Sequence, residues 1–313
     1  MKTRLAAALA AAALTLTACA GDDLEAEGTD ESSAPATGGG AVTIGTQAFD
    51  EALLVTALYQ GVLEDAGYDV TVNAVDTRDV YVGEMPGSVD LAPEYVGGIA
   101  DFLNATENGP DAEPITTSDT QETIDAATPL LEAKGLVLLE PSEATSQNAY
   151  FVTQDYADEL GATALSDLEG ESVVLAAAPD CEGRADCEGG LTDVYGIDVT
   201  ELLPLGFASP QTYEAVLSGE AQVGQTGTLD GTLDEQGLVL LEDDRGIQPA
   251  QNLVPLVSEE FLAENEGVED LLNGLMAELD NEVLADLIAR VTVDREQPDA
   301  VADEFLAEVG LVS

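Results

Sequence analysis

Four tyrosines are the residues of this sequence best suited to chemistry on a small ligand. Tyr95, Tyr150, Tyr195 and Tyr213 belong to a small aromatic set of eight Tyr, six Phe and no Trp. Each falls near a predicted junction between a strand and a loop or helix, where the cleft residues of α/β proteins collect. Electron-rich rings that meet at one point hold a cation with no N–H to donate, such as a quaternary ammonium ion. A half-buried structural role is the alternative for each tyrosine.

A single arginine stands between two cysteines in a short polar stretch. Arg184 lies between Cys181 and Cys187 and is one of only eight basic residues. A guanidinium group presents a planar fork that suits a ligand carboxylate. An ion pair with Asp180 or Asp186 is the alternative, and spacing alone favours it.

The overall charge excludes several classes of function. The chain has 63 acidic residues, eight basic residues and no His, for a net charge of −55. Such a charge repels a phosphate backbone and excludes a nucleic-acid partner. Without His there is no Ser-His or Cys-His nucleophile and no His-ligated zinc. No phosphate-binding loop or metal-ligand cluster is present in the sequence, so we expect neither cofactor nor metal. A hydrolase that uses paired carboxylates is the remaining enzyme alternative.

The N-terminus has the pattern of an export signal. Basic Lys2 and Arg4 precede an apolar run that ends in Leu-Thr-Ala-Cys at Cys19, which resembles the lipobox of bacterial lipoproteins. We expect residues 1–18 to be a signal peptide and Cys19 to carry lipid at the outer face of the cytoplasmic membrane. An ordinary secretory signal is the alternative. Residues 19–40 predict a disordered tether. Outside the membrane, the two remaining cysteines predict a disulfide.

The body of the chain alternates between strand and helix patterns. This order predicts an α/β fold with mainly parallel sheets. Extended stretches at 141–153 and 245–257 flank a central unit. They suggest two crossing segments between one lobe, residues 41–147 plus 248–313, and a second lobe, residues 148–247. A single doubly wound domain is the alternative.

Six stretches of this body together resemble a known family. They are residues 44–51, 89–98, 147–150, 179–196, 213–223 and 241–246, ordered along nearly all of the chain after the tether. The resemblance is to the substrate-binding lipoproteins of ABC importers for glycine betaine, carnitine and choline, of the ProX or OpuC type. The sequence departs from the family pattern at Ala48, Asp50 and Ala92.

The resemblance carries expectations about fold and site. It implies a two-lobed periplasmic-binding-protein-like fold of type II with the ligand cleft between the lobes. It places the ligand's methylated nitrogen in a cage of the four tyrosines and its carboxylate at Arg184. Gln47 and Asn148 are further candidates for polar contacts. The cysteines that flank Arg184 resemble a variant of the family.

The expected function is binding without chemistry. A monomeric carrier would capture a quaternary-ammonium osmoprotectant (glycine betaine, carnitine, proline betaine or choline) and deliver it to a membrane permease. Because Arg184 favours a carboxylate, we expect betaines and carnitine to be preferred over choline. A protein of the same fold for an amino acid, proline or ectoine is the alternative. The acidic surface suits a saline habitat, or it reflects lineage composition alone.

Overall fold

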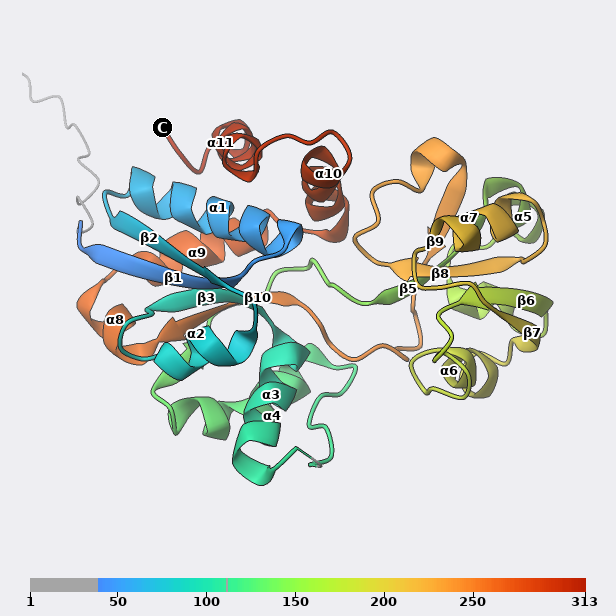
Figure 1. The fold of residues 1–313 in the computed structure, drawn as a ribbon, viewed down its shortest axis with the longest axis horizontal. Coiled ribbons are helices and arrows are strands. Elements are labelled where there is room, and N and C mark those ends of the chain that lie inside the picture. Colours follow the sequence, from blue (N-terminus) through green and yellow to red (C-terminus); the bar gives the residue numbers. More distant parts are fainter. Residues whose placement is uncertain (1–38, 111) are drawn as a thin grey trace, which may run out of the picture. The chain divides into compact units, whose positions relative to one another are not determined.

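Two five-stranded sheets organise the computed structural model, which describes residues 39–110 and 112–313 (Figure 1). The first sheet has the order β2-β1-β3-β10-β4. Its strands are β1 (Ala41–Gln47), β2 (Asp69–Val75), β3 (Leu91–Tyr95), β4 (Leu136–Leu138) and β10 (Leu253–Ser258). The second sheet has the order β7-β6-β8-β5-β9. Its strands are β5 (Asn148–Thr153), β6 (Ser172–Ala177), β7 (Asp198–Pro204), β8 (Val223–Gly227) and β9 (Leu238–Leu241).

Helices cover both faces of the first sheet. One face packs against α1 (Asp50–Asp65), α9 (Val268–Ala277), α10 (Asn281–Thr292) and α11 (Pro298–Val309). The other face packs against α2 (Arg78–Glu84), α3 (Val96–Asn108) and α4 (Thr120–Glu132), while α8 (Glu259–Glu264) follows β10. The predicted apolar stripe of α1 is confirmed, because Leu54, Leu58 and Val62 are buried.

The second sheet has a separate core on each face. The helices α5 (Gln154–Leu160) and α6 (Glu188–Asp193) flank one face, and α7 (Pro210–Leu217) covers the other. Neighbouring residues of a strand point to opposite faces. Tyr150 therefore enters the core on the α5 and α6 face, whereas Phe151 enters the core beneath α7.

Four of the five strands in each sheet run in the same direction, as expected, but each sheet is mixed because one strand is reversed. In the first sheet β10 runs antiparallel to β3 and β4. In the second sheet β5 runs antiparallel to β8 and β9. Both strands begin directly after a segment that leads from one sheet to the other, so they do not belong to strand-helix-strand units. Only such units impose parallel pairing.

Two segments connect the sheets and pair with each other. Residues 139–147 lead from β4 to β5, and residues 242–252 lead from β9 to β10. Thr145 and Asn252 form an antiparallel bridge. The amide of Ser146 donates to the carbonyl of Gln251 at 3.0 Å. The lobe limits stay a prediction. They assign residues 41–147 plus 248–313 to one lobe and residues 148–247 to the other, which agrees with the division of strands between the sheets.

The predictions for the N-terminus fall outside the described residues. They are the signal peptide at 1–18, the lipidated Cys19 and all but the last two residues of the tether. Within residues 39–110 and 112–313, none of the helices has the length and apolar character needed to span a bilayer.

Candidate functional site

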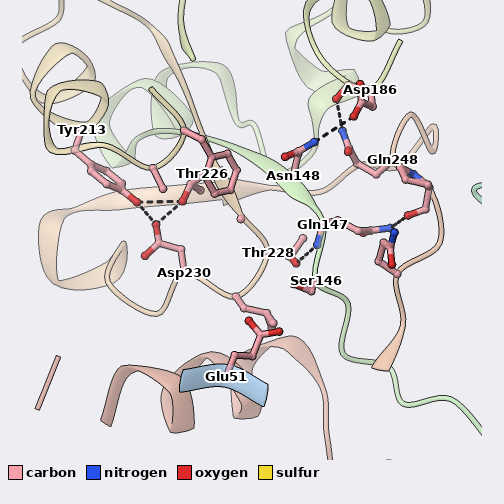
Figure 2. A pocket seen from close by; sticks show the side chains of 16 residues that line it. Glu51, Ser146, Gln147, Asn148, Asp186, Tyr213, Thr226, Thr228, Asp230 and Gln248 are labelled. Carbon is pink, nitrogen blue, oxygen red and sulfur yellow. Dashed lines mark hydrogen bonds between the residues drawn. The ribbon is translucent and has the colours of Figure 1, made fainter. Parts of the chain in front are cut away.

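A cavity of about 540 Å³ lies where the end of β8 meets the two connecting segments. Figure 2 shows Tyr213, Thr226 and Asp230 on one side of it and Asn148, Asp186 and Gln248 on the other. Glu51 of α1 also lines it. The volume falls in the range of small-molecule sites, which is roughly 300–1,000 Å³.

Tyr213 of α7 provides one aromatic wall of this cavity. Its ring stacks on Phe151 with a centroid distance of 5.1 Å and an interplanar angle of 24°. Its hydroxyl donates to Asp230 Oδ2 at 2.5 Å and lies 3.0 Å from Thr226 Oγ1. Burial, followed by the bond to Asp230, raises the pKa of Tyr213. The phenol is therefore protonated, with its ring held by Phe151 and its hydroxyl held by Asp230.

Phe207 provides a second aromatic surface, and the chain forms an unusual turn to present it. Its side chain lines the cavity and the residue is 49% exposed. The next residue, Ala208, has φ of 45°, a left-handed conformation that is uncommon for a residue with a Cβ. Ser209 then caps α7, because its Oγ accepts the amide of Thr212 at 3.1 Å.

Asp230 is held by a ring of donors in addition to Tyr213. Thr226 Oγ1 donates to it at 2.6 Å, and Thr232 donates from Oγ1 at 2.7 Å and from its amide at 3.1 Å. Burial by itself raises the pKa of the Asp230 carboxyl, but these bonds together outweigh it and the pKa lies below its ordinary value. Asp230 is therefore a negative charge at the cavity wall.

Asp186 connects the opposite wall to Arg184. Arg184 binds both of its carboxylate oxygens, at 2.9 Å from Nε and 2.5 Å from Nη2, and also binds Asp180 at 2.9 Å from Nη1. The hydrogen bond from Arg184 lowers the pKa of Asp186, although burial opposes it. The amide nitrogen of Asn148 lies 3.3 Å from Asp186 Oδ2, and that of Gln248 donates to the Asp186 carbonyl at 2.7 Å.

Glu51 adds a third carboxylate. It accepts a hydrogen bond from the Tyr95 hydroxyl. Burial raises the pKa of Glu51, and hydrogen bonds from Tyr95 and Ser146 only partly oppose the shift. Among the described residues that line the cavity, none is Lys or Arg.

The structure brings Asn148 and Tyr213 to one cavity and distributes the other predicted residues elsewhere. Tyr150 lines a second cavity, of about 400 Å³, that shares Asn148 and Gln248 with the first. Gln47 and Tyr95 line a third, of about 20 Å³. Tyr195 is fully buried, donates to Asp243 and lines none of these three cavities.

Sheet geometry explains why three of the tyrosines separate. Tyr150 and Tyr195 belong to the core on one face of the second sheet, and Tyr213 packs on the core of the other face. The expected position near a junction between a strand and a helix holds for Tyr95, the last residue of β3, and for Tyr195, which lies between α6 and β7. Tyr213 instead lies within α7. A cage that includes Tyr95, Tyr150 and Tyr195 stays a prediction for the ligand-bound protein.

Comparison with known proteins places this geometry in a family. The family model of the substrate-binding domain of ABC-type glycine betaine transport systems matches residues 40–308. The chain belongs to this family. The glycine-betaine-binding protein of Pseudomonas aeruginosa is 27% identical over 277 residues, which is 85% of this chain and 86% of the relative. The glycine betaine-binding protein YehZ of Escherichia coli is 28% identical, over 86% of this chain and 90% of the relative.

Solved structures of such proteins share the fold. The structure of apo YehZ from E. coli superimposes with a TM-score of 0.74 at 26% identity and covers 87% of this chain and 99% of that chain. A structure described as a glycine betaine/carnitine/choline ABC transporter has a TM-score of 0.73 at 18% identity, over 86% of this chain and 99% of that chain. The two mixed sheets are those of a type II periplasmic-binding-protein-like fold.

In this substrate-binding domain the predicted disulfide between Cys181 and Cys187 is present, with a Cα–Cα distance of 5.3 Å. Both cysteines are buried against the same core as Tyr150 and Tyr195. The bridge closes the loop that carries Arg184. Arg184 itself forms the ion pairs that spacing favoured, with Asp180 and Asp186. Its role as a ligand for a substrate carboxylate stays a prediction.

Sequence reasoning missed several residues that line the cavity of this family member. They are Glu51, Asp186, Phe207, Asp230 and Gln248. Phe207 left one signal, since an aromatic residue between Gly206 and the Ser-Pro start of a helix stands in a turn, where it is hard to bury. Glu51, Asp186 and Asp230 are three of 63 acidic residues, so their residue type alone does not single them out.

Proposed function

We propose that this chain captures a quaternary-ammonium osmoprotectant in the cavity at the end of β8. As the substrate-binding component of an ABC-type glycine betaine transport system, it would deliver this solute to the membrane permease. The observation that carries the proposal is the placement of two aromatic surfaces, Phe207 and Tyr213, beside the carboxylates of Asp186 and Asp230 in one cavity. A methylated ammonium ion has no N–H to donate and is recognised by ring faces and negative charge.

Tyr213 supplies a ring face that is held in place before the ligand arrives. The stack on Phe151 and the bond to Asp230 restrict its two rotatable torsions. A ligand that meets an ordered wall loses less free energy to side-chain ordering on binding. We propose that Asn148 contributes a polar contact beside it, and that Tyr95, Tyr150 and Tyr195 contribute as the lobes close.

The proposed mechanism is capture and release without a chemical step. Ligand contacts shift the equilibrium between an open and a closed arrangement of the lobes only as far as they favour the closed one. The paired segments 139–147 and 242–252 are the proposed hinge. The relatives named above are binding proteins, which supports a role other than that of an enzyme.

The family's transport role places the domain outside the cytoplasm, where solute is collected. We propose that Cys19 carries the lipid anchor that holds it at the membrane and that it acts as a monomer. Mass spectrometry of the mature protein tests the anchor, because an acylated N-terminal cysteine adds the mass of its acyl chains. An unmodified N-terminus at another residue would contradict it.

Calorimetry with a panel of solutes tests the function. Glycine betaine, carnitine, proline betaine and choline form the proposed class, and proline and ectoine represent other cargo. We expect binding within the first group that is largely lost in Tyr213→Ala. Tyr156→Ala is the matched control, because Tyr156 is a partly exposed tyrosine of α5 that does not line the cavity. Equal binding by both variants would contradict the assigned site.

A further inference from the structure

The cavity walls carry an unbalanced charge. Glu51, Asp186 and Asp230 line them, and none of the described lining residues is Lys or Arg. Arg184 offsets only the charge of Asp186, because its guanidinium forms ion pairs with Asp186 and with Asp180, which does not line the cavity. A ligand in the cavity therefore meets a net negative environment, and opposite charge is favoured there.

Three hydroxyl groups of the walls already donate their hydrogens to acceptors within the protein. Tyr213 and Thr226 donate to Asp230 Oδ2. Thr228 donates to the carbonyl of Thr145. A hydroxyl has one hydrogen to give. None of these three groups can donate to a ligand carboxylate without breaking its present bond to an acceptor in the protein.

Three of the four side-chain amides of the walls also direct their nitrogen atoms at protein acceptors, whereas the fourth, Gln251, accepts the amide of Gly98 through its oxygen. Gln147 Nε2 donates to the carbonyl of Pro249 at 2.7 Å, and Gln248 Nε2 donates to that of Asp186 at 2.7 Å. Asn148 turns its nitrogen toward Asp186, and Figure 2 shows its oxygen on the opposite side, toward Thr226. The hydroxyls of Tyr213, Thr226 and Thr228 thus have no hydrogen left for a ligand, while the carboxylate oxygens of the walls and Asn148 Oδ1 can accept from a ligand that brings a donor.

We infer that the cavity selects, within the quaternary-ammonium class, a net cation that carries a hydroxyl group over zwitterions that carry a carboxylate. Choline is the simplest such cation. It shares its trimethylammonium group with glycine betaine, so the ring faces of Phe207 and Tyr213 would make the same contacts with both ligands. The difference lies at the other end, where a hydroxyl donates to an acceptor such as Asn148 Oδ1, and a carboxylate meets like charge. This inference rests on the proposed function and reverses the preference expected from Arg184.

Calorimetry with choline and glycine betaine on the full chain tests the inference. We expect choline to bind at least tenfold more tightly at low ionic strength, with a ratio that shrinks as salt is added. Equal or tighter binding of glycine betaine would overturn the inference and leave the proposed function standing. If no member of the quaternary-ammonium panel binds, the proposed function itself is wrong and the inference falls with it.

A charge-neutralising variant makes the test sharper. Asp186→Asn removes one wall charge and frees two bonds of Arg184, so choline should bind more weakly and glycine betaine more tightly. Opposite changes for the two ligands cannot come from general loss of structure, and a thermal melt checks the fold. Asp193→Asn is the control, because Asp193 is an exposed acid of α6 that does not line the cavity. A ratio that Asp186→Asn leaves unchanged would overturn the inference.

Discussion

Tyr213 and Asp230 are joined by a 2.5 Å hydrogen bond that links a helix to the turn after β8. Asp230 also accepts from Thr226 and Thr232, so the same carboxylate orients the ring of Tyr213 and closes the turn. A phenol that donates to a carboxylate has a more electron-rich ring than a free phenol. In the proposed binding site, this pair would therefore couple the local fold to the binding of a cation.

A double-mutant cycle measures this coupling. Tyr213→Phe and Asp230→Asn should each lower the free energy of unfolding by about 1.5–3 kcal/mol, the range for hydrogen bonds to charged groups. The double variant should lose less than the sum, with a coupling energy of about 1 kcal/mol or more. Urea denaturation gives all four values. Strict additivity would show that the bond contributes nothing to stability.

Phe207 should affect binding without affecting stability. The residue is 49% exposed, so Phe207→Ala should change the free energy of unfolding by only about 0.5 kcal/mol or less. Loss of a cation–π surface of about 0.5–2 kcal/mol should weaken binding of a quaternary amine roughly two- to thirtyfold.

Leu217→Ala is the control for Phe207→Ala. Leu217 is 50% exposed in α7 and does not line the cavity. Calorimetry with choline compares the two variants with the unchanged protein. An affinity that falls equally in both, or in neither, would exclude Phe207 from the ligand site.

The bridge between Cys181 and Cys187 should stabilise the chain modestly. The cysteines are separated by six positions, and closing so short a loop contributes about 2 kcal/mol in the chain-entropy model. Urea denaturation with and without reductant should show this loss on reduction. Reductant should have no effect on the variant with both Cys181→Ala and Cys187→Ala, and an effect there would point to a cause other than this bridge.

Two carboxylates of the cavity should titrate on opposite sides of their ordinary values. Burial raises the pKa of Glu51 above its ordinary 4.5, and hydrogen bonds hold the pKa of Asp230 below its ordinary 3.8. Carbon-13 spectra of the carboxyl groups, assigned through Glu51→Gln and Asp230→Asn, measure both midpoints. A midpoint for Asp230 above that for Glu51 would contradict the described contacts.

These shifts have opposite consequences for stability. The contribution of Asp230 is present above about pH 3.8 and is lost as the pH falls through its lowered pKa. The contribution of Glu51 is present below about pH 4.5 and is lost as the pH rises through its raised pKa. Asp230→Asn should therefore lower the free energy of unfolding less in strong acid than at neutral pH. Glu51→Gln should have its most favourable effect on the free energy of unfolding at neutral pH.

The sequence by itself determined the features that depend on local pattern. The helical recurrence of Leu54, Leu58 and Val62 predicts α1, and alternation of strand and helix predicts the layers. Motif order along the chain predicts the family that the comparison shows. Two cysteines within one short loop predict their own bridge. Each of these depends on residues that are close in the chain or on ordered motifs, which a sequence displays directly.

Only the tertiary structure decided which residues share a cavity. Phe207, Asp230 and Asp186 come from three separate loops and line one cavity where β8 ends beside the connecting segments. The pairing of β5 with β8 and β9 also places a different core on each of its faces, so Tyr150 and Phe151 enter opposite cores, and Tyr150 and Tyr195 separate from Tyr213. Strand direction and register arise from long-range pairing between segments of the chain. The local pattern around a tyrosine or an acid carries no record of that pairing.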